Sequence, residues 1–309
     1  MRIYIAGING MVGSAILEKA KEQGHQILGR SSTDLDLTNR EAVFSEMNSL
    51  KPDSLVIAAA KVGGIAANYS NPVDFLSINL QIQTNLLDAA HNAEIERVLF
   101  LGSSCIYPKF AQQPITESAI LTGELEPTNE PYSIAKIAGL KLVEAYRKQF
   151  GHKWISAMPT NLYGPRDNFD LESAHVLPAL LHRFHNAKIK DLPEVTIWGD
   201  GTPLREFLHV DDLASACLML IEKYDDKIAI NIGSGEETSI LELAQDIASV
   251  VGFKGKIIFD LSKPNGTPRK LLDSKVLSNL GWNAQIDLKT GLASTYHWFL
   301  NNEFKGNIK

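Results

Sequence analysis

Three residues with the types and order needed for carbonyl reduction follow an apolar stretch in the middle of the sequence. Ser103 comes directly after the run Val-Leu-Phe-Leu-Gly at residues 98–102, and Tyr132 and Lys136 follow in a Tyr-x-x-x-Lys step. Positions i and i+4 lie on one face of a helix, so we expect the phenol and the ammonium to point into the same pocket. A free phenol has a pKa of about 10, and a neighbouring cation favours the phenolate. The set predicts reduction of a ketone, with Ser103 bonded to the same oxygen.

A glycine-rich turn near the start of the chain predicts a dinucleotide site. Gly7, Gly10 and Gly13 form the pattern Gly-x-x-Gly-x-x-Gly between an expected strand at residues 2–6 and an expected helix at residues 14–23. Glycines let the backbone approach a pyrophosphate, whose charge is stabilised at the amino terminus of the helix. Because the triplet lies between a strand and a helix, it strongly indicates a dinucleotide cofactor.

The second expected strand, residues 26–28, indicates which dinucleotide binds. It ends at Gly-Arg-Ser-Ser, so Arg30 and Ser32 lie where an acidic residue would contact the adenosine ribose of NAD. A guanidinium beside two hydroxyls suits a 2'-phosphate, and we therefore favour NADP(H). Asp36 is placed to accept a hydrogen bond from the adenine amine.

The expected elements alternate between strand and helix as far as residue 165. Further strands are expected at residues 54–60, 98–102 and 154–158, and helices at residues 38–50, 73–92 and 132–150. Alternation of this kind predicts an α/β fold with a Rossmann-type doubly wound parallel sheet. Ligands of such sheets bind at the carboxyl ends of the strands, where we expect loops at residues 61–65 and 159–165.

Beyond residue 165 the alternation breaks down. A helix at residues 176–187 and a short strand at 195–198 are expected first, and strands at 207–210 and 228–232 are then expected to rejoin the main sheet, with Asp211 as a helix cap. We expect an NADP-binding Rossmann domain at residues 1–165 plus about 206–233, and a smaller, interleaved C-terminal substrate-binding domain at about 166–205 plus 234–309. A cleft between two such domains is a common ligand site.

Composition excludes several classes of protein. The 309 residues are 44% hydrophobic and 21% charged, which is ordinary for a globular enzyme and unlike a disordered chain or a coiled coil. The net charge of -6 offers no general basic surface for nucleic acid. Two cysteines, an early first strand and the lack of a long apolar run predict a cytoplasmic protein with no membrane span and no disulfide framework.

Long strings around these motifs resemble the extended short-chain dehydrogenase/reductase family over essentially the whole chain. They lie at residues 58–65, 102–108, 126–136, 159–165 and 266–270. Within the family the match narrows to enzymes that epimerise and then reduce a GDP-4-keto-6-deoxy sugar. The resemblance therefore implies a two-step, NADPH-dependent conversion of a nucleotide-sugar, with no metal ion.

The same resemblance implies a role for each catalytic residue. Tyr132 would protonate the C4 oxygen, Lys136 would hold the cofactor ribose and lower the pKa of the phenol, and Ser103 would orient the ketone. Cys105 and His175 would carry the epimerisation at C3 and C5. A thiol and an imidazole have pKa values of about 8.5 and 6.5, close enough to neutrality to exchange protons with the acidic carbons beside a ketone.

Two larger sets of binding residues are also implied. Those expected to contact the cofactor are Gly7, Asn9, Gly10, Met11, Val12, Gly13, Arg30, Ser32, Asp36, Leu37, Leu101, Gly102, Ser104, Lys136, Pro159, Asn161, Leu162 and His175. Those expected to contact the nucleotide-sugar are Arg183, Trp198, Arg205, Asn265 and Lys270. Some family members have Arg in place of Asn9 and Ser32, so the strength of the NADP preference stays open.

Two other functions fit the same residues. A nucleotide-sugar 4-epimerase or 4,6-dehydratase would keep and recycle its cofactor, although a dehydratase needs an additional carboxylate where Cys105 and Ile106 stand. A non-enzymatic dinucleotide sensor would usually lack the complete Ser, Tyr, Lys set. A homodimer is expected through helices 73–92 and 133–150, as the family suggests.

Overall fold

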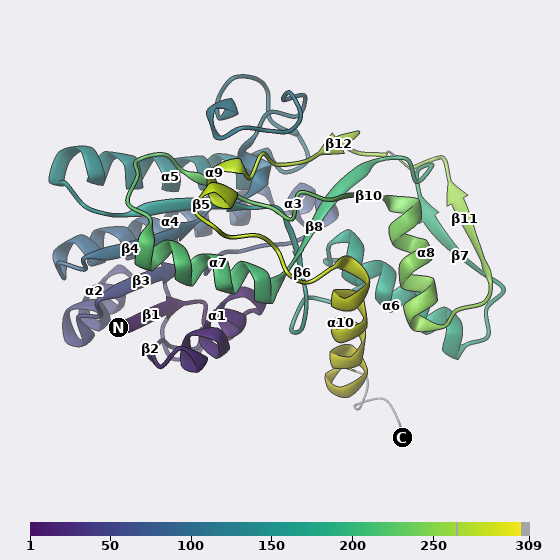
Figure 1. Ribbon diagram of the computed structural model, residues 1–309, viewed down its shortest axis with the longest axis horizontal. Helices are drawn as coiled ribbons and strands as arrows, with labels where there is room; N and C mark the ends of the chain where they lie inside the picture. The colour runs from purple at the N-terminus through teal and green to yellow at the C-terminus, as the bar shows by residue number, and fades with distance from the viewer. Residues whose placement is uncertain (264, 304–309) are drawn as a thin grey trace.

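The computed structural model describes residues 1–263 and 265–303, and its centre is a parallel sheet with the strand order β2-β1-β3-β4-β5-β9 (Figure 1). The strands are β1 (Arg2–Ala6), β2 (Gln26–Leu28), β3 (Ser54–Ile57), β4 (Arg97–Leu101), β5 (Ile155–Pro159) and β9 (Ile230–Ile232). Every residue of β3, β5 and β9 is buried, because helices cover both faces of the sheet. This sheet confirms the predicted Rossmann-type fold.

Two layers of helices enclose the sheet. Helices α1 (Met11–Glu22) and α7 (Val210–Lys223) pack together on one face. Helices α2 (Arg40–Leu50), α4 (Pro72–Asn92) and α5 (Glu130–Phe150) cover the other. Side chains alternate between the faces along each strand, so Ile3 and Ile5 enter the first core whereas Tyr4 and Ala6 enter the second.

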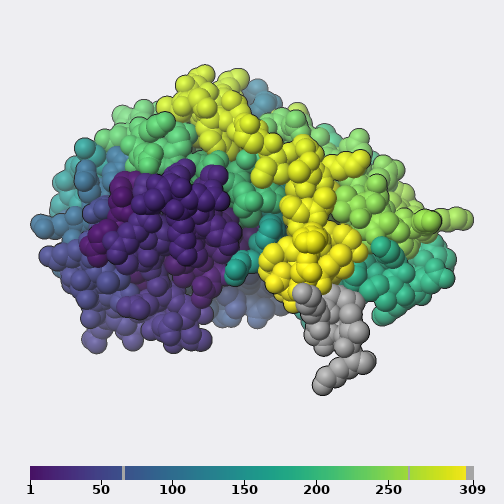
Figure 2. Space-filling model, turned by 60° about the horizontal axis from the view of Figure 1, so that its bottom comes forward, coloured from purple at the N-terminus to yellow at the C-terminus, as the bar shows by residue number. Residues whose placement is uncertain are grey.

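The remaining elements build a second lobe beyond the carboxyl end of the sheet (Figure 1). Strands β6 (Asn161–Tyr163), β8 (Leu204–His209), β10 (Glu237–Ser239) and β12 (Arg269–Lys270) form a small mixed sheet, and β7 (Glu194–Trp198) pairs in parallel with β11 (Lys256–Asp260). Helices α6 (Val176–Ile189), α8 (Ile240–Val251) and α10 (Leu288–Asn302) share a third hydrophobic core. Figure 2 shows the yellow C-terminal segment lying between the purple N-terminal part and the green lobe.

Short helical segments occupy the connections. They are α3 (Ile65–Ser70), α9 (Lys275–Asn279) and the single turns η1 (Ser104–Ile106) and η2 (Glu117–Ala119). In the described ranges, no helix combines the length and the apolar character required to cross a membrane, and no cluster of three or more His, Cys, Asp or Glu side chains is arranged to hold a metal ion.

Several local predictions were wrong. Strand β8 does not rejoin the main sheet but pairs with β6, β10 and β12, whereas β9 does rejoin it. Residues 161–163, expected in a loop, form the strand β6. His209, not Asp211, caps α7, because its ring nitrogen accepts a hydrogen bond from the Asp211 amide. The last six residues of the predicted second domain, 304–309, lie outside the described part of the chain.

The glycine turn shows why this segment requires glycine. Gly7 has a positive φ of 87°, and its carbonyl oxygen accepts the Gly10 amide at 3.0 Å. A Cβ atom on Gly13 would overlap with the same carbonyl oxygen. The start of α1 therefore lies directly against the turn that leads out of β1, and its amides remain close to the space beyond the strand.

We predict that Gly13→Ala lowers the free energy of unfolding by about 1–3 kcal/mol, because the methyl group forces the helix away from the turn. Urea unfolding followed by circular dichroism measures this change. Gly10→Ala is the matched control, since its Cβ would meet the Gly7 oxygen at 3.4 Å. Equal stability of the Gly13→Ala variant and the wild type would contradict the proposed close approach.

Candidate active site

Ser103 and Tyr132 meet at the carboxyl end of β4. Ser103 ends the extended segment after β4, and its oxygen accepts the Cys105 amide at 3.2 Å as the cap of η1. Tyr132 lies in the first turn of α5, and its hydroxyl is hydrogen-bonded to the Ser103 side chain. The predicted pairing of the serine and the phenol is therefore present in the structure.

The pKa of Tyr132 shifts in the direction opposite to the prediction. Burial raises the pKa of Tyr132 above its usual value, the nearby Cys105 thiol group raises it further, and the Ser103 hydrogen bond opposes both effects. The sequence led us to expect that Lys136 would lower the pKa of this phenol. Desolvation outweighs any such effect, which keeps the hydroxyl protonated and suited to donate a proton.

Lys136 lies one helical turn after Tyr132 and is fully enclosed. Its Nζ atom donates to the Leu101 carbonyl oxygen at 2.8 Å and lies 5.0 Å from the centre of the Phe100 ring and 5.9 Å from that of Tyr132. Burial lowers the pKa of Lys136 to about 8. The ammonium thus lies beside the phenol ring, as the i, i+4 spacing predicted.

Cys105 and His175 face the same charged group. The Lys270 Nζ atom donates to Cys105 Sγ at 3.5 Å. His175, at the start of α6, is open to solvent, yet the surrounding protein is close enough that burial lowers its pKa, and the Lys270 charge adds to this effect. The Lys270 ammonium therefore contacts the thiol and lies close enough to the imidazole to lower its pKa.

A small cavity of about 50 Å³ separates the Cys105 loop from the strand that carries Lys270. Glu126 and Lys109 also line it and form an ion pair at 3.0 Å. The cavity borders the loop that follows the carboxyl end of β4, and ligands of parallel sheets bind at the carboxyl ends of strands.

The other residues predicted to bind the nucleotide-sugar lie in the second lobe. The Arg183 guanidinium lies 5.5 Å from the centre of the exposed Trp198 ring, and Lys263 lies 5.6 Å from it. Asn265 accepts the Asp200 amide at 2.9 Å and so packs against the turn after β7. Burial lowers the pKa of Arg205, whereas the nearby Glu126 opposes this. Arg205 neighbours Lys270 across the β8–β12 pair.

The glycine turn before α1 suits a dinucleotide. The first turn of α1, which includes Met11 and Val12, contains no acidic residue, and Gly10 caps the helix without a side-chain hydrogen bond. A Cβ atom on Gly7 would come within 2.9 Å of the Ala59 backbone, so the turn is tightly packed against the end of β3. Open amides at a helix amino terminus, with no competing carboxylate, suit a pyrophosphate.

The charged side chains that are predicted to contact the adenosine half of the cofactor already have protein partners. Arg30 Nε donates to Glu46 at 2.8 Å, which raises the pKa of the guanidinium. Asp36 accepts the amide and the hydroxyl of Thr38 at 2.9 and 2.7 Å, and these bonds lower the pKa of its carboxyl. The contacts of Arg30 with a 2'-phosphate and of Asp36 with adenine stay predictions.

The Asn79 amide has a structural role. Asn79 is buried, accepts the Lys61 amide at 2.8 Å and donates to the Lys61 carbonyl at 3.0 Å. It therefore holds the loop after β3. The sequence also missed Gln113, Glu206 and Asn231, whose side chains bond backbone groups far along the chain. Their residue types carry no local signal, because their partners are known only once the chain is folded.

Comparison with known proteins identifies the family. Residues 3–233 match the model of the NAD dependent epimerase/dehydratase family. The chain belongs to this family. It is 56% identical to a putative GDP-L-fucose synthase 2 of Arabidopsis thaliana, covering 97% of this chain and 92% of that protein. It is 51% identical to the GDP-L-fucose synthase of Escherichia coli strain K12, covering 99% of both chains.

The fold is also similar to that of a solved member of this family. A GDP-L-fucose synthetase from Naegleria fowleri bound to NADP superposes with a TM-score of 0.90 at 27% identity, covering 98% of this chain and 95% of that one. The likeness spans both lobes, because nearly all of each chain takes part in it. The Ser103, Tyr132 and Lys136 set lies at the carboxyl edge of the parallel sheet of this fold.

We predict that Lys136→Met abolishes ketone reduction yet stabilises the fold at neutral pH. The folded-state pKa of about 8 lies below the ordinary lysine value of 10.5, so burial of the ammonium destabilises the wild type below pH 8. This cost disappears as the pH rises from 8 to 10.5. The advantage of the variant should therefore shrink by on the order of 2–3 kcal/mol between pH 7 and pH 10.

Urea titrations of both proteins at pH 7 and pH 10 measure this difference. Lys141→Met is the control, because Lys141 is an exposed lysine on the same helix that pairs with Glu144. A stability difference that does not change with pH would show that the Lys136 ammonium is not destabilised by burial.

Proposed function

We propose that this protein is a bifunctional, NADPH-dependent enzyme that converts GDP-4-keto-6-deoxy-D-mannose into GDP-L-fucose by epimerisation at C3 and C5 followed by reduction at C4. The observation that carries the proposal is the position of Cys105, whose amide donates to Ser103 at 3.2 Å and whose carbonyl oxygen accepts the hydroxyl of Ser133, the residue after Tyr132, at 2.9 Å. A reductase alone needs the serine, tyrosine and lysine. A thiol facing the same recess supports proton exchange beside the ketone, and the relatives named GDP-L-fucose synthase support it further.

Epimerisation begins with removal of a proton from a carbon beside the ketone. The Cys105 thiolate takes the proton, the electron pair of the broken C–H bond moves into an enolate, and the negative charge develops on the C4 oxygen. Ser103 and Tyr132 donate hydrogen bonds to that oxygen, which stabilises the charge. His175 returns a proton to the opposite face of the carbon, so the configuration inverts.

Reduction uses the same oxygen site. Bound NADPH supplies a hydride to C4. As the carbonyl becomes a hydroxyl, Tyr132 gives its proton to the oxygen, and the buried ammonium of Lys136 beside the ring stabilises the phenolate that is left. Ser103 holds the oxygen in line with the phenol. Because one oxygen serves both steps, the sugar need not leave the site between them.

The nucleotide half of the substrate is held by the second lobe. Arg205 suits a diphosphate, because a guanidinium binds two phosphate oxygens at once and burial strengthens that contact. Arg183 and Trp198 offer a cation and an aromatic face, and Asn265 borders the same turn. Arg30, Ser32 and Asp36 in turn bind the adenosine half of NADPH.

The division of labour follows the two lobes. We propose residues 1–165 plus about 206–233 as the cofactor domain and about 166–205 plus 234–309 as the substrate domain, with β8 contributing pairing to the second sheet. A cytoplasmic location is also proposed, since both cysteines are free, which suits a reducing compartment. Fractionation of cell extracts tests the location.

The decisive assay incubates the protein with GDP-4-keto-6-deoxy-D-mannose and NADPH in heavy water. We predict consumption of one NADPH per sugar, with deuterium at C3 and C5 of the product. Cys105→Ser should lower the deuterium exchange by at least about a hundredfold while NADPH affinity is kept, and Tyr132→Phe should lower NADPH oxidation by a similar factor. NADPH loss is read at its absorbance band and the product by nuclear magnetic resonance.

Either of two results would overturn the proposal. Turnover without net NADPH consumption would favour a 4-epimerase or 4,6-dehydratase. Wild-type deuterium exchange in Cys105→Ser would remove the thiol from the mechanism. Cys217→Ser is the matched control, since this second cysteine is buried in α7.

We also propose a homodimer formed through the outer faces of α4 and α5. Val73 and Ile134 support this, because 72% and 42% of their surfaces are exposed on these adjacent helices. Sedimentation velocity should give twice the chain mass of 34.0 kDa, and Ile134→Lys should shift the protein toward a single chain. A wild type that sediments as a single chain at micromolar concentration would refute the dimer.

A further inference from the structure

Lys270 makes a contact that nucleotide binding does not explain. Its ammonium donates to Cys105 Sγ at 3.5 Å and also lowers the pKa of His175, second to burial. The two groups proposed to exchange protons with the sugar therefore face one cation. A nearby cation favours the charged form of a thiol, the thiolate, but the neutral form of an imidazole.

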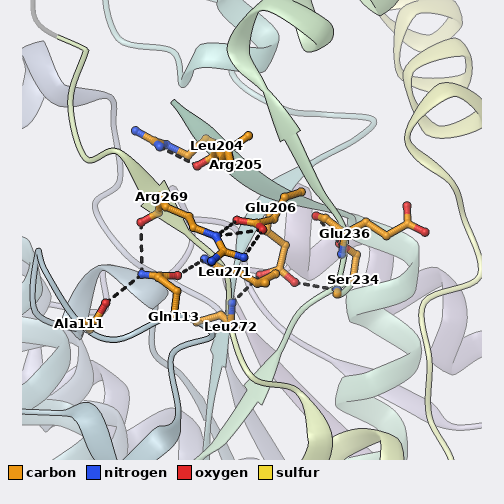
Figure 3. A network of polar contacts seen from close by, with 12 residues as sticks. Ala111, Gln113, Leu204, Arg205, Glu206, Ser234, Glu236, Arg269, Leu271 and Leu272 are labelled. Carbon is orange, nitrogen blue, oxygen red and sulfur yellow. Dashed lines mark hydrogen bonds and ion pairs between the residues drawn. The ribbon is translucent and has the colours of Figure 1, made fainter. Parts of the chain in front are cut away.

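A set of buried polar side chains holds the strand that carries Lys270. Figure 3 shows β12 between Gln113 on one side and Glu206 on the other. Gln113 accepts the Leu271 amide at 2.8 Å, and the fully buried Glu206 carboxylate accepts the amides of Leu272 and Gly235 at 3.1 and 2.8 Å. Burial raises the pKa of Glu206, against the effect of these hydrogen bonds.

Asn231 extends this set to the catalytic loop. It accepts the hydroxyl of Tyr107, two residues after Cys105, at 2.5 Å, and it donates to the carbonyl oxygens of Ile115 and Asp273 at 2.9 and 3.2 Å. The side chain is completely buried on β9. The Cys105 loop and the segment after Lys270 are thus bonded to one residue, which keeps their separation constant.

The other charges around the cavity have partners of opposite sign. Lys109 pairs with Glu126 at 3.0 Å, and Arg269 pairs with Glu237 at 2.6 Å. The Tyr132 hydroxyl is bonded to Ser103 and stays protonated, so it adds no charge. Among the cations that line the cavity in the described part of the chain, the Lys270 ammonium is therefore the one in direct contact with the thiol.

We propose that Lys270 is the counter-ion of Cys105, which holds the thiol as a thiolate ready to remove a proton from the sugar, and that Gln113, Glu206 and Asn231 keep the ammonium in place. This inference rests on the proposed function for its consequence in catalysis. The contact between the Lys270 ammonium and the Cys105 thiol is a property of the free enzyme and does not require a substrate. Lys270 acts through Cys105 and is a positioning residue in this role.

Alkylation of Cys105 by iodoacetamide tests the proposal without any substrate, because the thiolate is the reacting form. The rate is measured by mass spectrometry of intact protein between pH 6 and pH 10. Lys270→Met should lower the rate at pH 7 by about tenfold and approach the wild type near pH 10. Lys270→Arg should keep most of the wild-type rate at pH 7. Cys105→Ser gives the background from Cys217.

Lys275→Met is the matched control, since Lys275 is an exposed lysine near Lys270 that pairs with Asp273 at 3.3 Å. It should leave the alkylation profile unchanged. Lys270→Gln gives a second neutral variant if the methionine variant fails to fold, and Glu206→Gln should shift the profile in the same direction by releasing β12.

The inference about Lys270 and the proposed function can each be refuted while the other holds. Superimposable alkylation profiles of wild type and a folded neutral Lys270 variant would overturn the inference. A shifted profile in a protein that does not turn over the GDP-sugar would uphold the inference and refute the proposed function. With an active enzyme, the same variants should lose deuterium exchange at pH 7 by about tenfold and regain it near pH 10.

Discussion

The hydrogen bond from the Lys136 ammonium to the Leu101 carbonyl oxygen ties the catalytic helix to the catalytic strand. It joins α5, which carries Tyr132, to the last residue of β4, which leads to Ser103. The bond is buried, so it is made in a medium where an unpaired ammonium would be costly, and burial lowers the pKa of Lys136 to about 8. The contact therefore fixes the phenol relative to the serine, although burial of the charge lowers stability at neutral pH.

Around this bond the two lobes divide the chemistry. The parallel sheet delivers the reducing residues and the dinucleotide groove to its carboxyl edge, and the second lobe brings Lys270 and Arg205 to the same recess on neighbouring strands. Cys105 and Lys270 are far apart in the sequence. They are in contact because β12 and the buried side chains that hold it place Lys270 beside the Cys105 loop. A bifunctional site is thus assembled from the carboxyl edge of a parallel sheet and a separately anchored strand.

Local sequence patterns predicted the positions of helices and strands better than the pairing between strands. The expected strand at residues 207–210 is real, but it pairs with β6, β10 and β12 and not with the main sheet. Apolar content and length mark a strand, whereas the choice of neighbour depends on long-range pairing. The same reason explains why His209 and not Asp211 caps α7, since either residue type can accept a hydrogen bond and the backbone path decides which one does.

Residue type and spacing determined the alternation of strands and helices, the glycine turn and the Tyr132, Lys136 pair, because each depends on contacts within a strand, a turn or one helical face. Tertiary structure alone decided the protonation of Tyr132, the salt partner of Arg30 and the contact of Lys270 with Cys105. Those properties come from burial and from groups brought together across the chain. No local sequence pattern predicts desolvation or long-range pairing, because both arise only when the protein folds.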